Sequence, residues 1–273
     1  MTLSRRAGVY MVLVCVLVVL LSPFVWLGIT AVKAPSELRA VPIHWWPHEP
    51  TWSNFQQALT RIDYLGYARN SLMIAGMYAV LVTLASAWAG FGFARLNAPG
   101  KRIIFGVLLS TMMLPGVITL IPTYLLFAKF HLVNTYMPWV LWGLAGAPYL
   151  IFLFRQFFSN MPKELEEAAI VDGCGQIRIF WRIFLPQSWP VIATSLMLSF
   201  SWTWGDYLAP ALLLDDDRTT LAVKLATGYA TPSGAPLNNL VAAGAVMYVV
   251  PVLVLFLIMQ RGFMSGVATS GLK

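Results

Sequence analysis

The chain has 273 residues, of which 59% are hydrophobic and only 11% are charged. Soluble proteins carry about 25% charged residues, so this chain lacks the polar side chains that a water-exposed surface requires, and an ordinary soluble domain is excluded. The net charge of +7 does not indicate nucleic-acid binding, because the lysines and arginines stand singly between apolar runs and form no basic cluster.

Six apolar segments are long enough to cross the hydrocarbon layer of a membrane as helices, which takes about 20 residues each. They also contain Gly, Pro, Ser or Thr, which membrane helices tolerate when neighbouring helices satisfy the backbone. The predicted spans are about 9–31, 70–94, 103–127, 137–158, 189–211 and 239–260. We therefore expect an all-α membrane protein with six transmembrane helices.

The placement of lysine and arginine predicts how these helices are oriented. If the N-terminus lies inside, the inner segments hold more basic residues than the outer segments, although they are shorter. We therefore expect both termini in the cytoplasm. The polar stretch 159–188 then lies in the cytoplasm, between the fourth and fifth helices.

The outer loops contain two groups that resemble metal ligands. His44 and His48 have the i,i+4 spacing of zinc ligands on a helix, but Pro47 stands between them and no third ligand is evident. The acidic run 215–217 has the chemistry to bind a cation, but the sequence favours a solvated turn. We predict no metal site in this chain.

The cytoplasmic stretch that ends in EEAAIVDGCGQIRIFWRIFLP predicts two helices joined by a glycine elbow, at residues 162–186. The first helix has acids near its N-terminal end, where the helix dipole favours them, followed by two alanines. Gly173 then permits backbone angles that other residues avoid. The second helix must stop by Pro186 and has an apolar stripe at i, i+3, i+4 and i+7. Such an elbow can dock a partner protein, or it can lie on the membrane as an ordinary amphipathic loop.

The same stretch matches every defined position of the pattern EAA-x3-G-x9-I-x-LP, from Glu167 to Pro186. This pattern resembles the EAA motif of bacterial ABC-importer permeases. The stretches MMLPGVITLIPTYLLFAKFHLVNTYMP, WGDYLAP and FLIMQRGFMSGVATSGLK resemble the carbohydrate-uptake permeases of the maltose-transporter type, in their smaller six-helix subunit. The chain departs from the family at Cys174-Gly175, which either softens the elbow or fills a tight turn.

The resemblance implies a type-1 permease core at 70–260 that includes the coupling loop 159–188. Residues 1–69 would add the first helix with its outer loop, and 261–273 would form a cytoplasmic tail. The first helix of the elbow would be a coupling helix that docks on a cytoplasmic ATPase. The implied docking residues are Glu164, Glu167, Ala168, Ala169, Asp172 and Gly173. The residues expected to pack the second helix onto the membrane domain are Ile177, Phe180, Trp181, Phe184, Leu185 and Pro186.

The resemblance also implies the partners. They are a second permease subunit in a heterodimer, two copies of the ATPase, an extracytoplasmic solute-binding protein or lipoprotein, and a carbohydrate-like solute, glycerol-3-phosphate-type compounds included. No G-x-x-x-x-G-K-[ST] loop is present in the chain, so we expect ATP and Mg to be used by the partner ATPase. We also expect no catalytic residue, no cofactor and no nucleic-acid partner for this chain. The expected location is the bacterial cytoplasmic (inner) membrane, as a multi-pass protein surrounded by lipid.

The solute path is less sharply defined by the sequence. Asp206 is the one acid inside a predicted span, which makes it a functional candidate. Its neighbours Trp204 and Tyr207 suit a sugar face, and the same pattern suits a structural role near an outer gate. Thr119, Thr123 and Tyr124 can line the cavity. Two asparagines and a serine, Asn70, Ser71 and Asn134, fit packing or capping.

Two other functions compete with import by an ABC permease. An ion-coupled secondary transporter or channel usually carries several buried charges or inverted repeats, and the sequence contains one such acid and no repeat. A membrane enzyme that used the run 215–217 would need those acids in a catalytic site on the cytoplasmic or lipid side, whereas the predicted topology places them outside.

Overall fold

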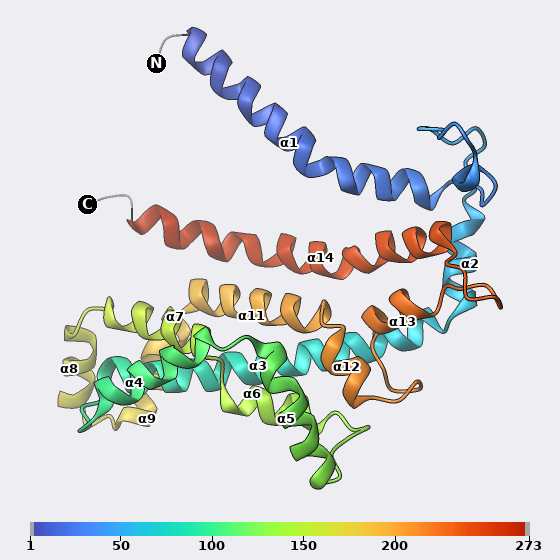
Figure 1. Ribbon diagram of the computed structural model, residues 1–273. Helices are drawn as coiled ribbons and strands as arrows, with labels where there is room; N and C mark the ends of the chain where they lie inside the picture. Colours follow the sequence, from blue (N-terminus) through green and yellow to red (C-terminus); the bar gives the residue numbers. More distant parts are fainter. Residues whose placement is uncertain (1–2, 271–273) are drawn as a thin grey trace. The chain divides into compact units, whose positions relative to one another are not determined.

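The computed structural model describes the backbone of residues 3–270 and the side chains of residues 8–260, and it is built from helices (Figure 1). Within that range no strand forms, and an isolated antiparallel bridge joins Ala230 to Pro236. The helical backbone continues to Ser270, whereas the side chains of the predicted tail 261–273 lie outside the described residues. The all-α fold class is confirmed for the described residues.

The chain divides into two compact units, residues 1–68 with 223–251 and residues 69–222 with 252–273. The first unit contains α1 (Leu3–Ala31), α2 (Ser53–Arg61), most of α13 (Leu221–Thr227) and the first part of α14 (Asn238–Ser270). The second unit contains the rest of α14, most of α3 (Tyr64–Arg95), and then α4 (Lys101–Ser110), α5 (Gly116–Lys129), α6 (Met137–Ala145), α7 (Pro148–Ser159), α8 (Glu164–Val171), α9 (Gln176–Ile179), α10 (Leu185–Gln187), α11 (Trp189–Trp204) and α12 (Leu208–Leu213).

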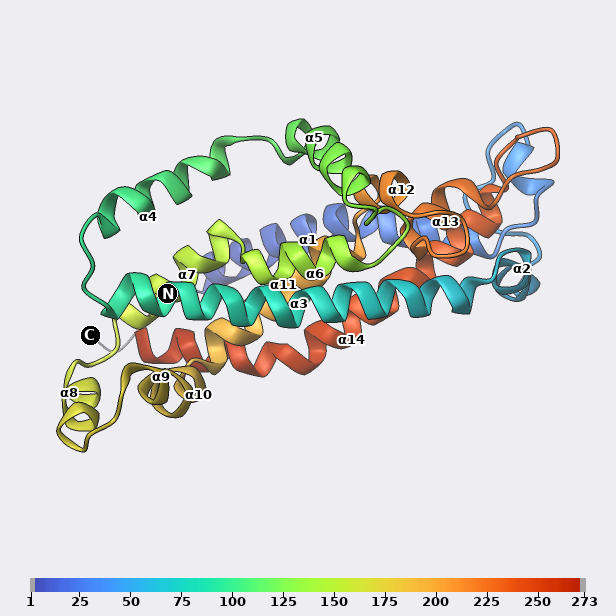
Figure 2. The same cartoon turned by 90° about the horizontal axis from the view of Figure 1, so that it is seen from below.

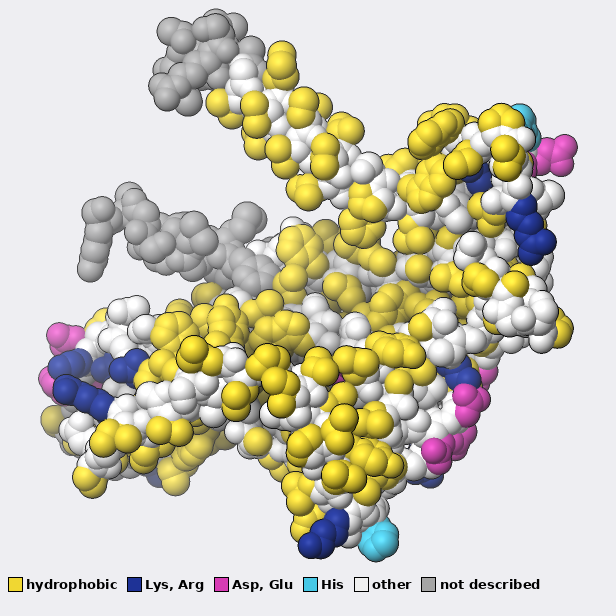
Figure 3. Space-filling model, in the orientation of Figure 1, with side chains coloured by type: hydrophobic (Ala, Val, Ile, Leu, Met, Phe, Trp, Pro, Cys, Tyr) yellow, Lys and Arg dark blue, Asp and Glu magenta, His cyan; other side chains and the backbone are white. Residues whose placement is uncertain are grey.

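Four helical segments of the described chain are long and apolar enough to cross a membrane, and two bent pairs raise that number to six if each pair is one span. The four segments are Gly8–Ala31, Tyr64–Arg95, Met137–Ser159 and Asn238–Gln260. The bent pairs are Lys101–Met113 with Gly116–Lys129, at 101°, and Gln176–Gln187 with Trp189–Trp204, at 80°. Apolar side chains cover the described length of α1, as Figure 3 shows.

The predicted span 103–127 is not one continuous helix. It breaks between α4 and α5, where Leu114 and Pro115 adopt extended backbone with ψ angles of 121° and 128°. Proline cannot donate a backbone hydrogen bond, and it disfavours the helical region for the residue before it. Pro122, by contrast, lies inside α5 without ending it.

The predicted helix 189–211 is also interrupted. Its regular part, α11, ends at Trp204, and α12 begins at Leu208 after a short turn that contains Gly205 and Asp206. Glycine weakens a helix interior, and the backbone N–H groups at the start of the new helix need partners of their own. The turn at residues 205–207 therefore divides one apolar segment into two helices.

An aromatic cluster fills the second unit between α3, α7 and the segment after α9. It consists of five buried rings, Phe91, Phe154, Phe158, Phe180 and Phe184. The ring centroid of Phe91 lies 5.1 Å from that of Phe184, with the planes inclined at 66°, a T-shaped arrangement that aromatic pairs favour. This aromatic cluster ties the predicted second helix of the elbow to α3 and α7.

Small residues let α3 approach α6 and α7 closely. A Cβ atom on Gly90 would lie 2.6 Å from the Cβ of Phe154 and 3.0 Å from the backbone nitrogen of Arg155. A Cβ atom on Gly143 would lie 2.8 Å from the Cβ of Leu81. Membrane helices commonly use glycine in this way, because backbone-to-backbone approach maximises van der Waals contact.

Buried amides fasten α2 inside the first unit. The side-chain nitrogen of Asn54 donates to the carbonyl oxygens of Ala31 and Lys33, at 2.9 and 2.8 Å, and its side-chain oxygen accepts from Asn239 at 2.9 Å. The hydroxyl of Tyr229 donates to the carbonyl of Ala58 at 2.7 Å, and burial raises the pKa of Tyr229 to about 12. These contacts join the end of α1 to the start of α2, and they join α2 to the start of α14 and to the segment before it.

Candidate functional site

The first helix of the elbow, α8, ends in a glycine turn. The backbone N–H of Cys174 donates to the carbonyl of Ala169, and that of Gly173 donates to the carbonyl of Ile170, each at 2.9 Å. Gly173 has a φ of 76°, in the left-handed region that favours glycine. These paired bonds form the Schellman motif, which satisfies the last carbonyls of a helix while the chain reverses. Gly173 therefore allows the reversal at the end of α8.

The second glycine of the elbow has a different conformation. Gly175 has φ −75° and ψ 159°, ordinary extended backbone before α9, and a Cβ atom there would meet nothing within 4 Å. The Cys174-Gly175 departure from the family pattern thus leaves the glycine turn at Gly173 unchanged.

The residues predicted to dock a partner lie on α8 and its turn, but they face in two directions. The exposed members are Glu164, Glu167, Ala168, Asp172 and Gly173. Ala169 is only 6% exposed and packs with the aromatic cluster. The exposed surface of α8 therefore combines acids and the small Ala168 with the apolar Leu165, Ile170 and Val171, and Ala169 belongs to the attachment of the helix.

The predicted apolar stripe of the second helix differs from the buried face. Phe180 and Phe184 are buried in the aromatic cluster, whereas Ile177 and Trp181 are 65% and 50% exposed. Ile179, which the stripe did not include, is fully buried. The packing expected of Ile177 and Trp181 is therefore corrected.

A π-helical turn at Phe180–Phe184 explains the difference. Its hydrogen bonds join residues five apart, so it holds more residues in a turn than the 3.6 of an α-helix, on which the stripe was based. As a result Ile179 and Phe184, five residues apart, are both buried. Leu185, half-buried, packs against the aromatic cluster, while Pro186 is exposed.

Sequence reasoning missed Arg95, the last residue of α3, and counted it only as a basic residue of an inner segment. Its side chain is 6% exposed and lies 3.6 Å from the carboxylate of Glu166 on α8. Figure 2 shows α8 and α9 grouped at the C-terminal end of α3. The available signal was an arginine that closes a long apolar helix, where a cation complements the helix dipole.

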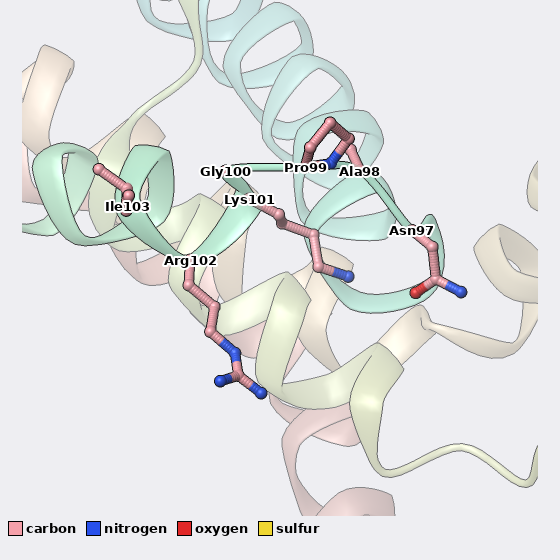
Figure 4. Close-up of a pocket in the computed structure, with 7 residues that line it drawn as sticks. All are labelled: Asn97, Ala98, Pro99, Gly100, Lys101, Arg102 and Ile103. Carbon is pink, nitrogen blue, oxygen red and sulfur yellow. The ribbon is translucent and has the colours of Figure 1, made fainter.

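Surface hollows lie in the second unit near its charged end, where lysine, arginine and acidic side chains gather around α8 (Figure 3). One, of about 740 Å³, is lined by residues 97–103 between α3 and α4 (Figure 4). There the amine of Lys101 donates to the carbonyl of Leu96 at 2.6 Å. Another, of about 510 Å³, is lined by the glycine turn and by Trp181, Arg178 and Arg182.

Asp206 caps a helix. Its carboxylate accepts the backbone N–H groups of Leu208 and Ala209, at 3.0 and 3.3 Å, which are among the unpaired donors at the start of α12. Of its two aromatic neighbours, Trp204 is buried and Tyr207 is exposed. The two hydrogen bonds account for an acid just after the end of α11 without a bound solute.

The candidates on α5 are also engaged locally. The hydroxyl of Thr119 donates to the carbonyl of Gly116 at 2.9 Å, and that of Thr123 donates to the carbonyl of Thr119 at 2.6 Å. Hydroxyl groups that bond back to their own helix are partly satisfied without a ligand. Tyr124 is half-buried and packs against an apolar cluster that includes Leu213 of α12.

Polar side chains from two places in the second unit hold the loop 214–221. Asn70 donates to a carbonyl of this loop at 3.2 Å, Ser71 accepts one of its N–H groups at 2.8 Å, and Asn134 accepts another at 3.2 Å. The three residues thus act on the backbone of the loop that carries the acidic run.

The rings of His44 and His48 lie with their centroids 4.5 Å apart in a T-shaped arrangement. Among the residues that the structure describes, no group of three or more His, Cys, Asp or Glu side chains is placed to hold a metal ion.

Comparison with known proteins identifies the group to which this geometry belongs. The family described as "Binding-protein-dependent transport system inner membrane component" matches residues 82–263. The arabinooligosaccharides transport system permease protein AraQ of Halalkalibacterium halodurans is 35% identical over 250 residues, which cover 90% of this chain and 84% of AraQ. The melibiose/raffinose/stachyose import permease protein MelC of Bacillus subtilis is 32% identical, with 92% and 91% covered.

A solved structure has the same fold. A chain of a bacterial ABC transporter involved in the import of the acidic polysaccharide alginate superimposes with a TM-score of 0.82, covering 96% of this chain and 98% of that one at 19% sequence identity. The resemblance drawn from the EAA motif is confirmed. The chain belongs to the family of binding-protein-dependent transport system inner membrane components, and it is a multi-pass permease of the bacterial inner membrane.

Proposed function

We propose that the chain is one permease subunit of an ATP-driven importer for a carbohydrate or a related solute, and that α8 is the helix through which a partner ATPase drives it. The observation that carries this proposal is the exposed acidic and small-residue face of α8, held on the aromatic cluster and closed by the turn at Gly173. The names of the two relatives, which specify arabinooligosaccharides and melibiose, raffinose and stachyose, favour a sugar-like solute.

The proposal includes the partners and the arrangement of the chain. A second permease subunit completes the pathway, two copies of the ATPase bind ATP and Mg, and an extracytoplasmic binding protein delivers the solute. Both termini lie in the cytoplasm, and the functional segments are 1–69, the core 70–260 with its coupling loop 159–188, and the tail 261–273.

The residues of α8 have different roles in this proposal. Glu167 pairs with a basic residue of the ATPase, because an exposed carboxylate on a helix suits an arginine or lysine. Ala168 lets the ATPase surface approach, and Glu164 and Asp172 extend the acidic face on either side. Ala169 faces the aromatic cluster and holds the helix in place.

The proposed solute path rests on where its residues lie in the helices. Thr119, Thr123 and Tyr124 are placed on α5, and Tyr207 is exposed beside the cap of α12. Asp206 and the buried Trp204 are assigned to the structure of the outer gate, since Asp206 already accepts two backbone hydrogen bonds.

The experiment that tests the function uses the complex of both permeases, the ATPase and the binding protein in proteoliposomes. Glu167→Arg places a like charge against the basic partner, and like charges at an interface cost several kcal/mol. Since about 1.4 kcal/mol is a tenfold change in binding, we expect retention of the ATPase and uptake to fall about tenfold or more. Glu49→Arg makes the same charge reversal in a predicted outer loop and should leave both unchanged.

Three outcomes would contradict the proposal. Glu167→Arg could support uptake at the level of the original complex, the ATPase could fail to co-purify with the unsubstituted permease, or the chain alone could transport solute with an ion gradient and no ATP. The last result would favour a secondary transporter.

A further inference from the structure

The long helix α3 ends in a buried cation. The side chain of Arg95 is 6% exposed and that of its partner Glu166 is 14% exposed. Charged side chains are almost never buried so deeply unless they are paired, because desolvation of each charge is costly. The position of Arg95 therefore needs an explanation in its contacts.

Arg95 contacts four different segments of the second unit. One terminal nitrogen lies 3.6 Å from the carboxylate of Glu166 on α8. The other donates to the carbonyl of Phe158 on α7, at 2.6 Å, and to the carbonyl of Met161 in the turn that follows. The guanidinium carbon lies 4.9 Å from the ring centroid of Phe184 in the π-helical turn. One side chain thus joins both ends of the α7–α8 connection and the second helix of the elbow.

The contacts made by the two terminal nitrogens and the guanidinium plane suit arginine better than lysine. Phe158 supplies one of the last carbonyls of α7, which have no donor within their own helix. Glu166 stands in the first turn of α8. A planar guanidinium presents donors along two edges at once and stacks on an aromatic ring, whereas a lysine amine is a single point charge.

Few contacts hold α8 in place. Of its eight residues, only Glu166 and Ala169 are not exposed. They stand three positions apart, so they share one face of the helix. Ala169 packs on the aromatic cluster and Glu166 pairs with Arg95. The ion pair is therefore the polar half of a two-point attachment of α8 to the second unit.

We propose that Arg95 is a positioning residue that locks α8 to the end of α3, so that a displacement of α8 moves α3 with it. This inference rests on the proposed coupling role of α8, and it adds the residue that carries force from the docking helix into a membrane-spanning helix. Two helices that move together must be joined by contacts that survive the movement, and Arg95 contributes contacts to α7, α8 and the π-helical turn at once.

The first test measures coupling in the reconstituted importer. Arg95→Lys keeps the positive charge but removes the planar guanidinium that contacts several partners at once. We therefore expect the ATPase to remain bound, while the amount of solute transported per ATP hydrolysed falls about tenfold, within the usual range of coupling between sites. Glu166→Gln should reduce this ratio less, because Arg95 keeps both carbonyl contacts. Arg102→Lys changes an exposed arginine at the start of α4 in the same way and should match the original ratio.

The second test measures the attachment itself. Spin labels at Asn97, just after α3, and at the exposed Val171, at the end of α8, report the distance between the two helices in a background with Cys15→Ala and Cys174→Ala. We expect one narrow distance distribution in the original chain and a broadened one in Arg95→Lys.

The outcomes separate this inference from the proposed function. If the original complex couples ATP hydrolysis to uptake but Arg95→Lys and Glu166→Gln keep its ratio and its narrow distances, the inference is overturned and the function stands. A lower thermal unfolding midpoint with an unchanged ratio would make Arg95 a stabilising residue only, which also overturns it. If the complex that carries Arg95→Lys does not assemble, the transport ratio and the spin-label distances of Glu166→Gln decide the test. Failure of the original complex to couple at all would instead overturn the proposed function.

Discussion

At the scale of single residues, the two glycines of the elbow are chemically identical and conformationally different. Gly173 has the left-handed φ of 76°, and Gly175 has an extended backbone that any residue adopts. The motif places a glycine at 173, but only the backbone geometry distinguishes it from its neighbour. The backbone at Gly175 therefore does not form a tight turn that requires glycine.

Substitution of these glycines gives the first prediction. Gly173→Ala should destabilise the elbow by about 1–2 kcal/mol, because a Cβ atom strains the left-handed conformation. Gly175→Ala is the matched control, since it has open space and an ordinary φ. Thermal unfolding of the purified complex and uptake per ATP measure the difference. Equal behaviour of the two variants would contradict the assignment of the turn to Gly173.

Asp206 gives a second prediction at this scale. If it caps α12, Asp206→Ser should keep most of the stability and an unchanged KM for uptake, because serine also accepts hydrogen bonds at this position. Asp206→Ala should lose about 1 kcal/mol of stability by removal of the cap. Uptake rates measured over a range of solute concentrations give the KM of each variant and of the original complex. A large rise in KM for Asp206→Ser would show that the carboxylate contacts the solute instead.

At the scale of helices, α3 depends on close contact with α7. Gly90→Ala would place a Cβ atom 2.6 Å from the Cβ of Phe154, and overpacking of this kind costs about 1–3 kcal/mol. Gly92→Ala lies two residues along the same helix with nothing within 4 Å, so it should be neutral or stabilise by up to about 1 kcal/mol. Unfolding midpoints of the two variants in detergent test this. A lower midpoint for Gly92→Ala than for Gly90→Ala would refute the packing argument.

The helices also show where sequence patterns stop being informative. Apolar length was enough to locate α1, α3 and α14, because a membrane-spanning helix needs a long apolar segment wherever it packs. A proline at position 115 makes a break in this segment foreseeable, but the bend of 101° between α4 and α5 cannot be read from the sequence. The buried face of the second elbow helix was misplaced, since a π-helical turn leaves no signature in a 3.6-residue periodicity.

The candidate site was predicted in part for a similar reason. The EAA pattern marked α8, Gly173 and Pro186 because their spacing is local. Arg95 lies 71 positions before Glu166 in the chain, and no local pattern joins them. Likewise the inward direction of Ala169 follows from the aromatic cluster, which is assembled from three separated segments.

At the scale of the whole molecule, the orientation in the membrane is open to a direct measurement. Lys163→Cys, before α8, and Ser233→Cys, before α14, are both at exposed positions, and each is made with Cys15→Ala and Cys174→Ala. With both termini in the cytoplasm, a membrane-impermeant maleimide should label Ser233→Cys in intact cells and Lys163→Cys only after the cells are opened. The opposite labelling would reverse the topology inferred from lysine and arginine placement.

The π-helical turn at Phe180–Phe184 has a consequence for the length of the chain. Such a turn holds one residue more than an α-helical turn, so deletion of a single residue within it would allow ordinary α-helix to form. Each residue of an α-helix corresponds to about 100° of rotation, and α8 would therefore be turned by that angle about the axis of the segment that follows. Glu166 and Ala169 would then point away from Arg95 and the aromatic cluster. A substitution changes one side chain, whereas a deletion here would change the direction of every residue on α8, so the number of residues in the turn sets the orientation of that helix.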